Sequence, residues 1–159
     1  MTPQEIAEKL KTKFGEAITD VKSEGVLDPF VKVKAEAMFD VALFLRDEAD
    51  LKFDYLMCLS GIDFGKGLIG VVYNLHSMTK KHKITVKVEV PREKPEIPSV
   101  ESVWKTANWH EREAYDLIGT IFTGHPDLRR ILLPYDWEGH PLRKDYKVPE
   151  YYQGMKVPY

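Results

Sequence analysis

The stretch ITVKVEV, residues 84–90, alternates aliphatic and polar residues without a break. Successive side chains of a β-strand point to opposite faces, so the aliphatic residues share one face and Thr85, Lys87 and Glu89 share the other. This alternation is typical of an antiparallel strand with one buried and one solvated face. It predicts a sheet that is covered by other elements on one side.

Two more strand-like runs precede this stretch, at residues 53–62 and 68–77. Gly65-Lys66-Gly67 and residues 79–83 supply the turn material between the three runs. Together they predict three consecutive strands joined by short hairpin connections.

The flanking segments complete the predicted order of elements. Thr2 and Glu5 form a capping box that opens a helix over residues 3–14, and residues 17–35 predict two strands around Ser23-Glu24-Gly25. An apolar helical face follows from Met38 to about Arg46.

Prolines 91, 95 and 98 then form a connector, and two helices are predicted after it. Ser99 caps the first, which carries Val100, Val103, Trp104 and Ala107. Asn108 and Glu111 open the second as a capping-box-like pair, and Gly119 ends it. The order α-β-β-α-β-β-β-α-α predicts an α+β fold, with a mixed or antiparallel sheet and helices packed on one face.

The character of the chain changes after residue 123. Prolines 126, 134, 141, 149 and 158 exclude a long helix, and five of the eight tyrosines lie in the last 25 residues. Such a segment has no periodic apolar face from which to build a core. We therefore divide the chain into a globular α+β domain, residues 1–123, and an extended, proline-rich C-terminal segment, residues 124–159, that must lie either on its own domain or on the surface of a partner.

Composition and charge exclude several classes of protein. The formal net charge is −2, and residues 124–159 hold six Lys or Arg against five Asp or Glu, which argues against a nucleic-acid partner. The single cysteine, Cys58, excludes an internal disulfide and a multi-thiolate zinc or iron–sulfur site. We expect no signal peptide and no membrane span, so any membrane association would come through a partner.

Two motifs resemble cofactor sites but lack the required context. Residues 65–70 match the dinucleotide fingerprint G-x-G-x-x-G, yet the β-rich run Val71-Val72-Tyr73 follows where a helix is needed. His110-Glu111 begins a zinc motif whose second histidine would be residue 114, which is alanine. A hairpin and a structural helix are the favoured interpretations.

The tripeptide Gly-His-Pro occurs twice, at residues 124–126 and 139–141. His125 and His140 could pair on a metal ion, but a histidine in such a turn more often bonds to the backbone, which is the interpretation we favour. The acids Glu111, Glu113 and Asp116 could be catalytic. Pairing of Arg112 with Asp116, four residues apart on a helix, is the simpler structural alternative.

Residues 111–146 read EREAYDLIGTIFTGHPDLRRILLPYDWEGHPLRKDY. This stretch closely resembles the signature of the 30-kilodalton subunit of respiratory complex I, which is the C subunit of bacterial NADH-quinone oxidoreductases. The sequence departs from the commonest pattern after Tyr146, where Lys147 stands in place of proline. That departure concerns only the local path of the tail.

The resemblance implies a non-redox structural subunit in the peripheral arm of a proton-translocating NADH-quinone oxidoreductase. It implies partners of two types, the large quinone-site subunit (D type) and an iron–sulfur subunit (B type), with FMN, iron–sulfur clusters and quinone held by partner subunits and no cofactor in this chain. It also implies a peripheral place on the cytoplasmic side of the bacterial inner membrane. Related subunits occur in membrane-bound hydrogenases and in dehydrogenases with other electron donors.

We predict no catalytic, cofactor-binding or metal-binding residue in this chain. The residues expected to contact partners are of the types that dominate protein interfaces. They are Arg112, Arg129, Arg130, Trp137, His140, Arg143 and Tyr146. The competing hypotheses are a stand-alone metalloenzyme using His125, His140 and nearby carboxylates, and a nucleic-acid-binding protein.

Overall fold

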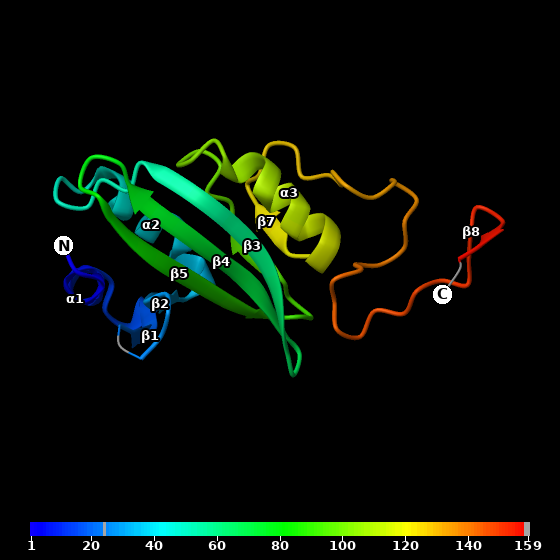
Figure 1. Ribbon diagram of the computed structural model, residues 1–159, viewed down its shortest axis with the longest axis horizontal. Coiled ribbons are helices and arrows are strands. Elements are labelled where there is room, and N and C mark those ends of the chain that lie inside the picture. Colours follow the sequence, from blue (N-terminus) through cyan, green and yellow to red (C-terminus); the bar gives the residue numbers. More distant parts are fainter. Residues whose placement is uncertain (24, 158–159) are drawn as a thin grey trace.

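The computed structural model describes residues 1–23 and 25–157, and its centre is a five-stranded sheet (Figure 1). The strand order is β1-β2-β5-β4-β3. The strands are β1 Ile18–Lys22, β2 Phe30–Val33, β3 Tyr55–Gly65, β4 Leu68–Ser77 and β5 His82–Pro91. Only β2 and β5 run parallel, so the sheet is mixed, as predicted.

Strand β5 is the central strand, and its alternation builds the core. Its buried residues align with buried residues of both neighbouring strands. One row crosses four strands through Val31, Val86, Tyr73 and Leu59. Cross-strand contacts of this kind fix the register, because a slip of one residue would turn every aliphatic side chain to the solvent.

Three α-helices cover the buried face of the sheet: α1 Pro3–Phe14, α2 Met38–Asp47 and α3 Ala107–Ile118. Their buried side chains, among them Leu10, Leu45 and Ile118, join the strand residues in one hydrophobic core. The opposite face of the sheet is polar, and an ion pair joins Lys32 Nζ to Glu89 Oε1 there at 2.7 Å. Two short 3-10 helices, η1 Gly15–Ala17 and η2 Ala35–Ala37, complete this region.

The hairpin between β3 and β4 contains the apparent dinucleotide fingerprint. Gly65 and Gly67 have φ values of +76° and +77°, a conformation that suits glycine. Gly70 lies inside β4, where an added Cβ would collide with the carbonyl oxygen of Val88. The fingerprint is therefore a turn and a strand, as predicted, with no helix after it.

The predicted helix after Ser99 is wrong. Residues 101–103 form turns, and β6 Glu96–Pro98 pairs in parallel with β7 Ile121–Thr123. The predicted capping box of α3 is also wrong, because Glu111 is fully buried and its carboxylate accepts hydrogen bonds from Ser99 Oγ at 2.6 Å and Val100 N–H at 2.8 Å. Glu111 thus fixes the loop before α3 rather than the first turn of the helix.

The C-terminal segment passes the end of α3 and then projects away from the sheet (Figure 1). No strand or α-helix forms between β7 and β8, and the segment ends in a small hairpin of β8 Tyr151–Tyr152 and β9 Met155–Lys156. The hairpin was not predicted. Among the residues described, no helix has the length and apolar character needed to cross a membrane.

Candidate functional site

The C-terminal end of α3 is the platform on which the C-terminal segment is held. Gly119 ends the helix with φ +84°, and the last carbonyl groups of a helix have no partner within it. The segment supplies the missing donors: His140 Nδ1 lies 2.9 Å from the carbonyl oxygen of Asp116, Leu142 N–H donates to that of Leu117, and Arg143 Nε donates to that of Ile118 at 2.6 Å. A side chain at Gly119 would collide with Arg143 and His140.

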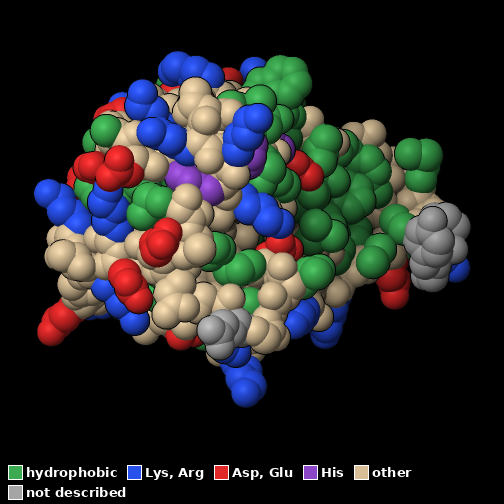
Figure 2. All heavy atoms as spheres, turned by 60° about the vertical axis from the view of Figure 1, so that its left-hand side comes forward, with side chains coloured by type: hydrophobic (Ala, Val, Ile, Leu, Met, Phe, Trp, Pro, Cys, Tyr) green, Lys and Arg blue, Asp and Glu red, His purple; other side chains and the backbone are tan. Residues whose placement is uncertain are grey.

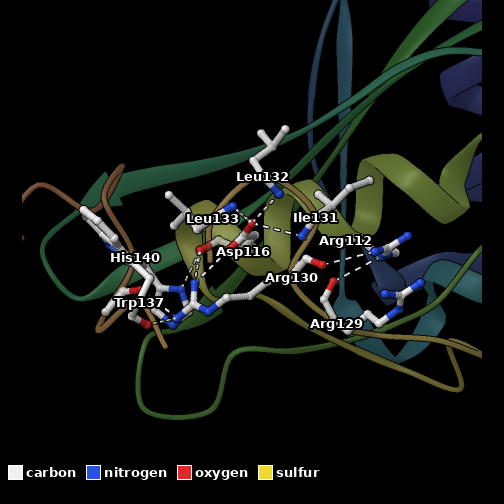
Figure 3. A network of polar contacts seen from close by, with 10 residues as sticks. Arg112, Asp116, Arg129, Arg130, Ile131, Leu132, Leu133, Trp137 and His140 are labelled. Carbon is white, nitrogen blue, oxygen red and sulfur yellow. Dashed lines mark hydrogen bonds and ion pairs between the residues drawn. The ribbon is translucent and has the colours of Figure 1, made fainter. Parts of the chain in front are cut away.

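Asp116 occupies the centre of this arrangement (Figure 3). Its side chain is fully buried, and its Oδ2 atom accepts three consecutive backbone N–H groups, from Ile131, Leu132 and Leu133, at 3.1, 2.8 and 2.9 Å. Its Oδ1 atom accepts Arg130 Nη1 at 2.6 Å. Successive N–H groups that converge in this way form an anion-binding nest, and here the anion is a side chain of the same protein.

The environment of Asp116 keeps its carboxyl group ionised. Burial by itself would raise the pKa of Asp116, but the N–H groups of residues 131–133 and the guanidinium of Arg130 outweigh burial and hold the pKa below its ordinary value. The negative charge is thus neutralised locally, and the contact is stable at neutral pH.

Two arginines extend the network along the segment. Arg130 also donates to the carbonyl oxygens of Trp137 at 2.9 Å and Gly139 at 3.1 Å. Arg112 donates to the carbonyl oxygens of Arg129 and Arg130 at 3.2 and 3.1 Å. The predicted pair between Arg112 and Asp116 is wrong, because the Asp116 carboxylate is already occupied by Arg130 and three amides.

A second buried carboxylate, Asp63, ties the segment to the β3–β4 hairpin. It accepts Arg92 Nη2 at 2.8 Å, Gly65 N–H at 2.8 Å and Lys144 N–H at 2.9 Å. These donors outweigh burial and lower the pKa of Asp63. Arg92 also forms an ion pair with Asp145, with Nη1 and Oδ2 2.6 Å apart. Lys144 and Asp145 of the segment are therefore both held at this point.

Both Gly-His-Pro histidines bond to the backbone, as predicted. His125 Nε2 lies 3.0 Å from the carbonyl oxygen of Asn108, and its Nδ1 accepts the N–H of Asp127 at 3.0 Å, which selects the neutral Nε2–H tautomer. Burial lowers the pKa of His140. No group of three or more His, Cys, Asp or Glu side chains suited to a metal ion occurs within residues 1–23 and 25–157.

The residues predicted to contact partners divide into two groups. Arg112, Arg130, His140 and Arg143 are directed into the protein, where they hold the segment on α3. The other three make these contacts within the segment: Arg129 pairs with Asp127 at 2.8 Å, Trp137 packs on Tyr152 with ring centroids 5.1 Å apart, and Tyr146 lies against Gly139. Their contact with partners stays a prediction.

A set of large apolar residues is exposed, which was not predicted from the sequence. Trp109, Leu132, Tyr135 and Leu142 are 71%, 62%, 76% and 58% exposed. Figure 2 shows hydrophobic side chains gathered in one continuous area on the side of the molecule toward the chain end. Leu142 also lines a groove of about 240 Å³ between β3 and α3, together with Ser60, His110 and Leu117. One signal in the sequence could have revealed Leu132 and Leu142: both lie between prolines, in a stretch without the periodic spacing that would bury them in a helix or strand.

The acids of α3 differ in exposure. Glu111 is buried beside Ser99, and burial raises its pKa to about 7. His125 Nε2 lies 4.0 Å from Glu111 Oε2. Glu113 is exposed at the groove between β3 and α3. These carboxylates therefore do not face one another across a common site.

Comparison with known proteins places this arrangement in a family. The profile of the family described as "Respiratory-chain NADH dehydrogenase, 30 Kd subunit" matches residues 31–152, which include most of the sheet, α3 and most of the C-terminal segment. The chain belongs to this family. The C subunits of bacterial NADH-quinone oxidoreductases are similar over nearly the whole chain: that of Chloroherpeton thalassium is 53% identical over 99% of this chain and 66% of its own length. That of Chlorobium phaeobacteroides is 52% identical over 94% of this chain and 92% of its own length.

Solved structures have the same fold. A trypsin-resistant fragment of Nqo5, residues 1–134 in its own numbering, superposes with a TM-score of 0.66 at 28% identity, over 80% of this chain and all of the fragment. A chain of the archaeal membrane-bound sulfane sulfur reductase superposes with a TM-score of 0.75 at 24% identity, over 92% of this chain and 86% of its own. The second likeness shows the fold alone.

Proposed function

We propose that this chain is a non-redox structural subunit in the peripheral arm of a proton-translocating NADH-quinone oxidoreductase, and that it docks on neighbouring subunits through its C-terminal segment. The observation that carries the proposal is that the buried charged and the exposed apolar side chains of that segment face opposite ways. Its buried charged groups bond to α3 and to the β3–β4 hairpin, while large apolar side chains remain on the outside.

The exposed side chains have the composition of a contact surface. Leu132, Tyr135 and Leu142 extend from the segment, and Trp109 extends from α3 beside it. Exposed large apolar side chains of this kind mark interaction sites, and a tryptophan or tyrosine that becomes buried in an interface commonly contributes a large share of the binding energy. Tyr151 and Met155, in the projecting hairpin, are also exposed and add large apolar side chains nearer the chain end.

The proposed partners are the large quinone-site subunit (D type) and the iron–sulfur subunit (B type) of the same complex. The similarity to C subunits of NADH-quinone oxidoreductases over nearly the whole chain supports this assignment. The solved Nqo5 fragment is described as trypsin-resistant and covers 80% of this chain, which supports a compact body that is separate from an accessible tail.

In this proposal FMN, iron–sulfur clusters and quinone belong to the partner subunits, and the chain binds none of them. It would reach the membrane only through the complex, on the cytoplasmic side. Its single cysteine, Cys58, supports the absence of a cluster, because iron–sulfur clusters need several thiolates. The engaged rings of His125 and His140 likewise argue against a stand-alone metalloenzyme.

Co-purification of the intact complex tests the proposal. The full-length tagged chain should bring down the quinone-site and iron–sulfur subunits together with the NADH-oxidising module. A chain without residues 135–159 should lose them while its body stays folded, as judged by circular dichroism. If the truncated chain retains its partners, docking by the segment is wrong. If a module for another electron donor is recovered instead, the assignment to NADH is wrong.

A further inference from the structure

We propose that Asp116 is the positioning residue of the docking surface. Its side chain is fully buried, yet it fixes the direction in which Leu132 and Leu142 point. The inference rests on the proposed function, because it concerns how the same surface is presented.

The first step is the geometry at Leu132. Its N–H group and those of Ile131 and Leu133 all converge on one carboxylate oxygen. Three amides that share one acceptor fix the backbone at these residues, so the side chains must point away from the carboxylate, as Figure 3 shows. Leu132 is the outermost of the three, with 62% of its surface exposed.

The second step links Asp116 to Leu142. Its backbone carbonyl oxygen holds the His140 ring at 2.9 Å, while Leu142 N–H is bound one residue further along the helix, at Leu117. The Asp116 carboxylate also orients Arg130, which donates hydrogen bonds to the carbonyl oxygens of Trp137 and Gly139. One residue of α3 therefore contacts the chain on both sides of the loop that separates the two leucines.

At residues 131–133, Asp116 accepts the backbone hydrogen bonds that no strand or helix supplies. Between β7 and β8 the segment has no helix or strand, so no backbone ladder determines its path. Arg130 is the cation that pairs with Asp116, and the three amides have no other acceptor among the hydrogen bonds of the described residues. Removal of the charge leaves those donors buried without an equivalent partner.

The matched substitutions are Asp116→Asn and Asp127→Asn. Both change one carboxylate to an amide, but Asp127 is exposed and pairs only with Arg129 beside it. In Asp116→Asn the side-chain NH₂ group must face either Arg130 or the amides, which are all donors. We expect Asp116→Asn to weaken association with the complex about ten-fold or more, and Asp127→Asn to change it less than about two-fold.

A double-mutant cycle with Leu132→Ala separates positioning from general destabilisation. If Asp116 acts through Leu132, the affinity of the double variant for the complex should be only slightly lower than that of the weaker-binding single variant. If the two residues act independently, the two fold-losses in affinity should multiply. Hydrogen exchange of the free chain adds a second test. Asp116→Asn should speed exchange at residues 131–133 and leave that of β4 and β5 unchanged.

The outcomes are distinct. Non-additive binding with local exchange supports the inference. Multiplicative binding losses, or faster exchange throughout the sheet, would show that Asp116 serves only the stability of the fold. If Leu132→Ala weakens association while Asp116→Asn does not, the positioning role is wrong and the docking function stands. If Leu132→Ala and Leu142→Ala together leave association intact, the proposed docking surface is wrong and the inference fails with it.

Discussion

The sheet region, residues 1–123, and the C-terminal segment from residue 124 are held in place by different forces. The sheet region buries rows of aliphatic side chains, such as Val31, Val86 and Tyr73, that extend across several strands. The segment has almost no core of its own and is held by hydrogen bonds from single side chains, above all Asp116 and Asp63. A region of the first kind has its own hydrophobic core, whereas a region of the second kind is shaped by the domain beneath it and leaves its apolar residues outside.

The largest effect is expected from a change in the core. Leu45 of α2 is fully buried, and Leu45→Ala should lower the free energy of unfolding by about 2–5 kcal/mol. Leu27 is 96% exposed, and Leu27→Ala should change it by less than about 0.5 kcal/mol. Urea unfolding of the isolated chain measures both. Similar values for the two variants would contradict the assignment of the core.

The next effect concerns the buried acid that fixes the loop before α3. The folded pKa of Glu111 is raised from 4.5 to about 7, so the folded protein binds this proton more tightly than the unfolded chain. The contribution of this group to stability should therefore be greatest at pH 4.5 and below and be lost as the pH rises to about 7, by about 3 kcal/mol in total.

Glu111→Gln is the matched control for this pH dependence. It preserves the shape of the side chain and can bond to Ser99 and Val100, but it cannot ionise. The difference in unfolding free energy between wild type and Glu111→Gln should be small at pH 4.5 and should grow up to pH 7. A difference that is constant over this range would show that Glu111 keeps an ordinary pKa.

A smaller and local effect is expected at the second buried carboxylate. Asp63→Asn removes the charge that binds Arg92 and the Lys144 amide, at a cost of about 1–3 kcal/mol. The main result should be release of the segment, seen as faster tryptic cleavage after Arg143 and Lys144. Asp145→Asn, at an exposed partner of the same arginine, should leave the cleavage rate nearly unchanged.

The smallest effect is expected at an exposed arginine of the segment. Arg129 pairs with Asp127 and with the Tyr135 hydroxyl in solvent, where water screens the charges and such pairs contribute little to stability. Arg129→Ala should therefore leave the melting temperature of the free chain nearly unchanged. A clear drop in the melting temperature would show that the segment depends on its surface charges as well.

The same contrast explains which elements the sequence could predict. Strand β5 and helix α1 follow from periodicity and capping, which depend on neighbours in the sequence. The run Val100, Val103, Trp104 and Ala107 has helical spacing, but its first three residues lie in turns and loop, because Trp104 Nε1 donates to the Phe53 carbonyl oxygen and Glu111 binds Val100 N–H. The parallel pairs β2–β5 and β6–β7 join residues far apart in the chain, which local patterns do not specify.

The site was harder to predict than the fold for the same reason. Helical spacing favoured Arg112 as the partner of Asp116, whereas the true partners are Arg130 and three backbone amides that only the folded segment brings together. The role of the two Gly-His-Pro turns was predicted, since their chemistry is local. The hairpin at β8 and β9 had one usable signal, the turn Gln153-Gly154, where both residues have positive φ values.

In the function proposed here, the charged residues hold the segment in place and the apolar residues contact the partner. The most direct test is to replace Leu132 and Leu142 together by serine in the full chain and to measure its retention in the purified complex, with Leu27→Ser as the control. We predict that the double variant is folded, with an unchanged melting temperature when free, and is lost from the complex, while Leu27→Ser is retained. Full retention of the double variant would contradict the account.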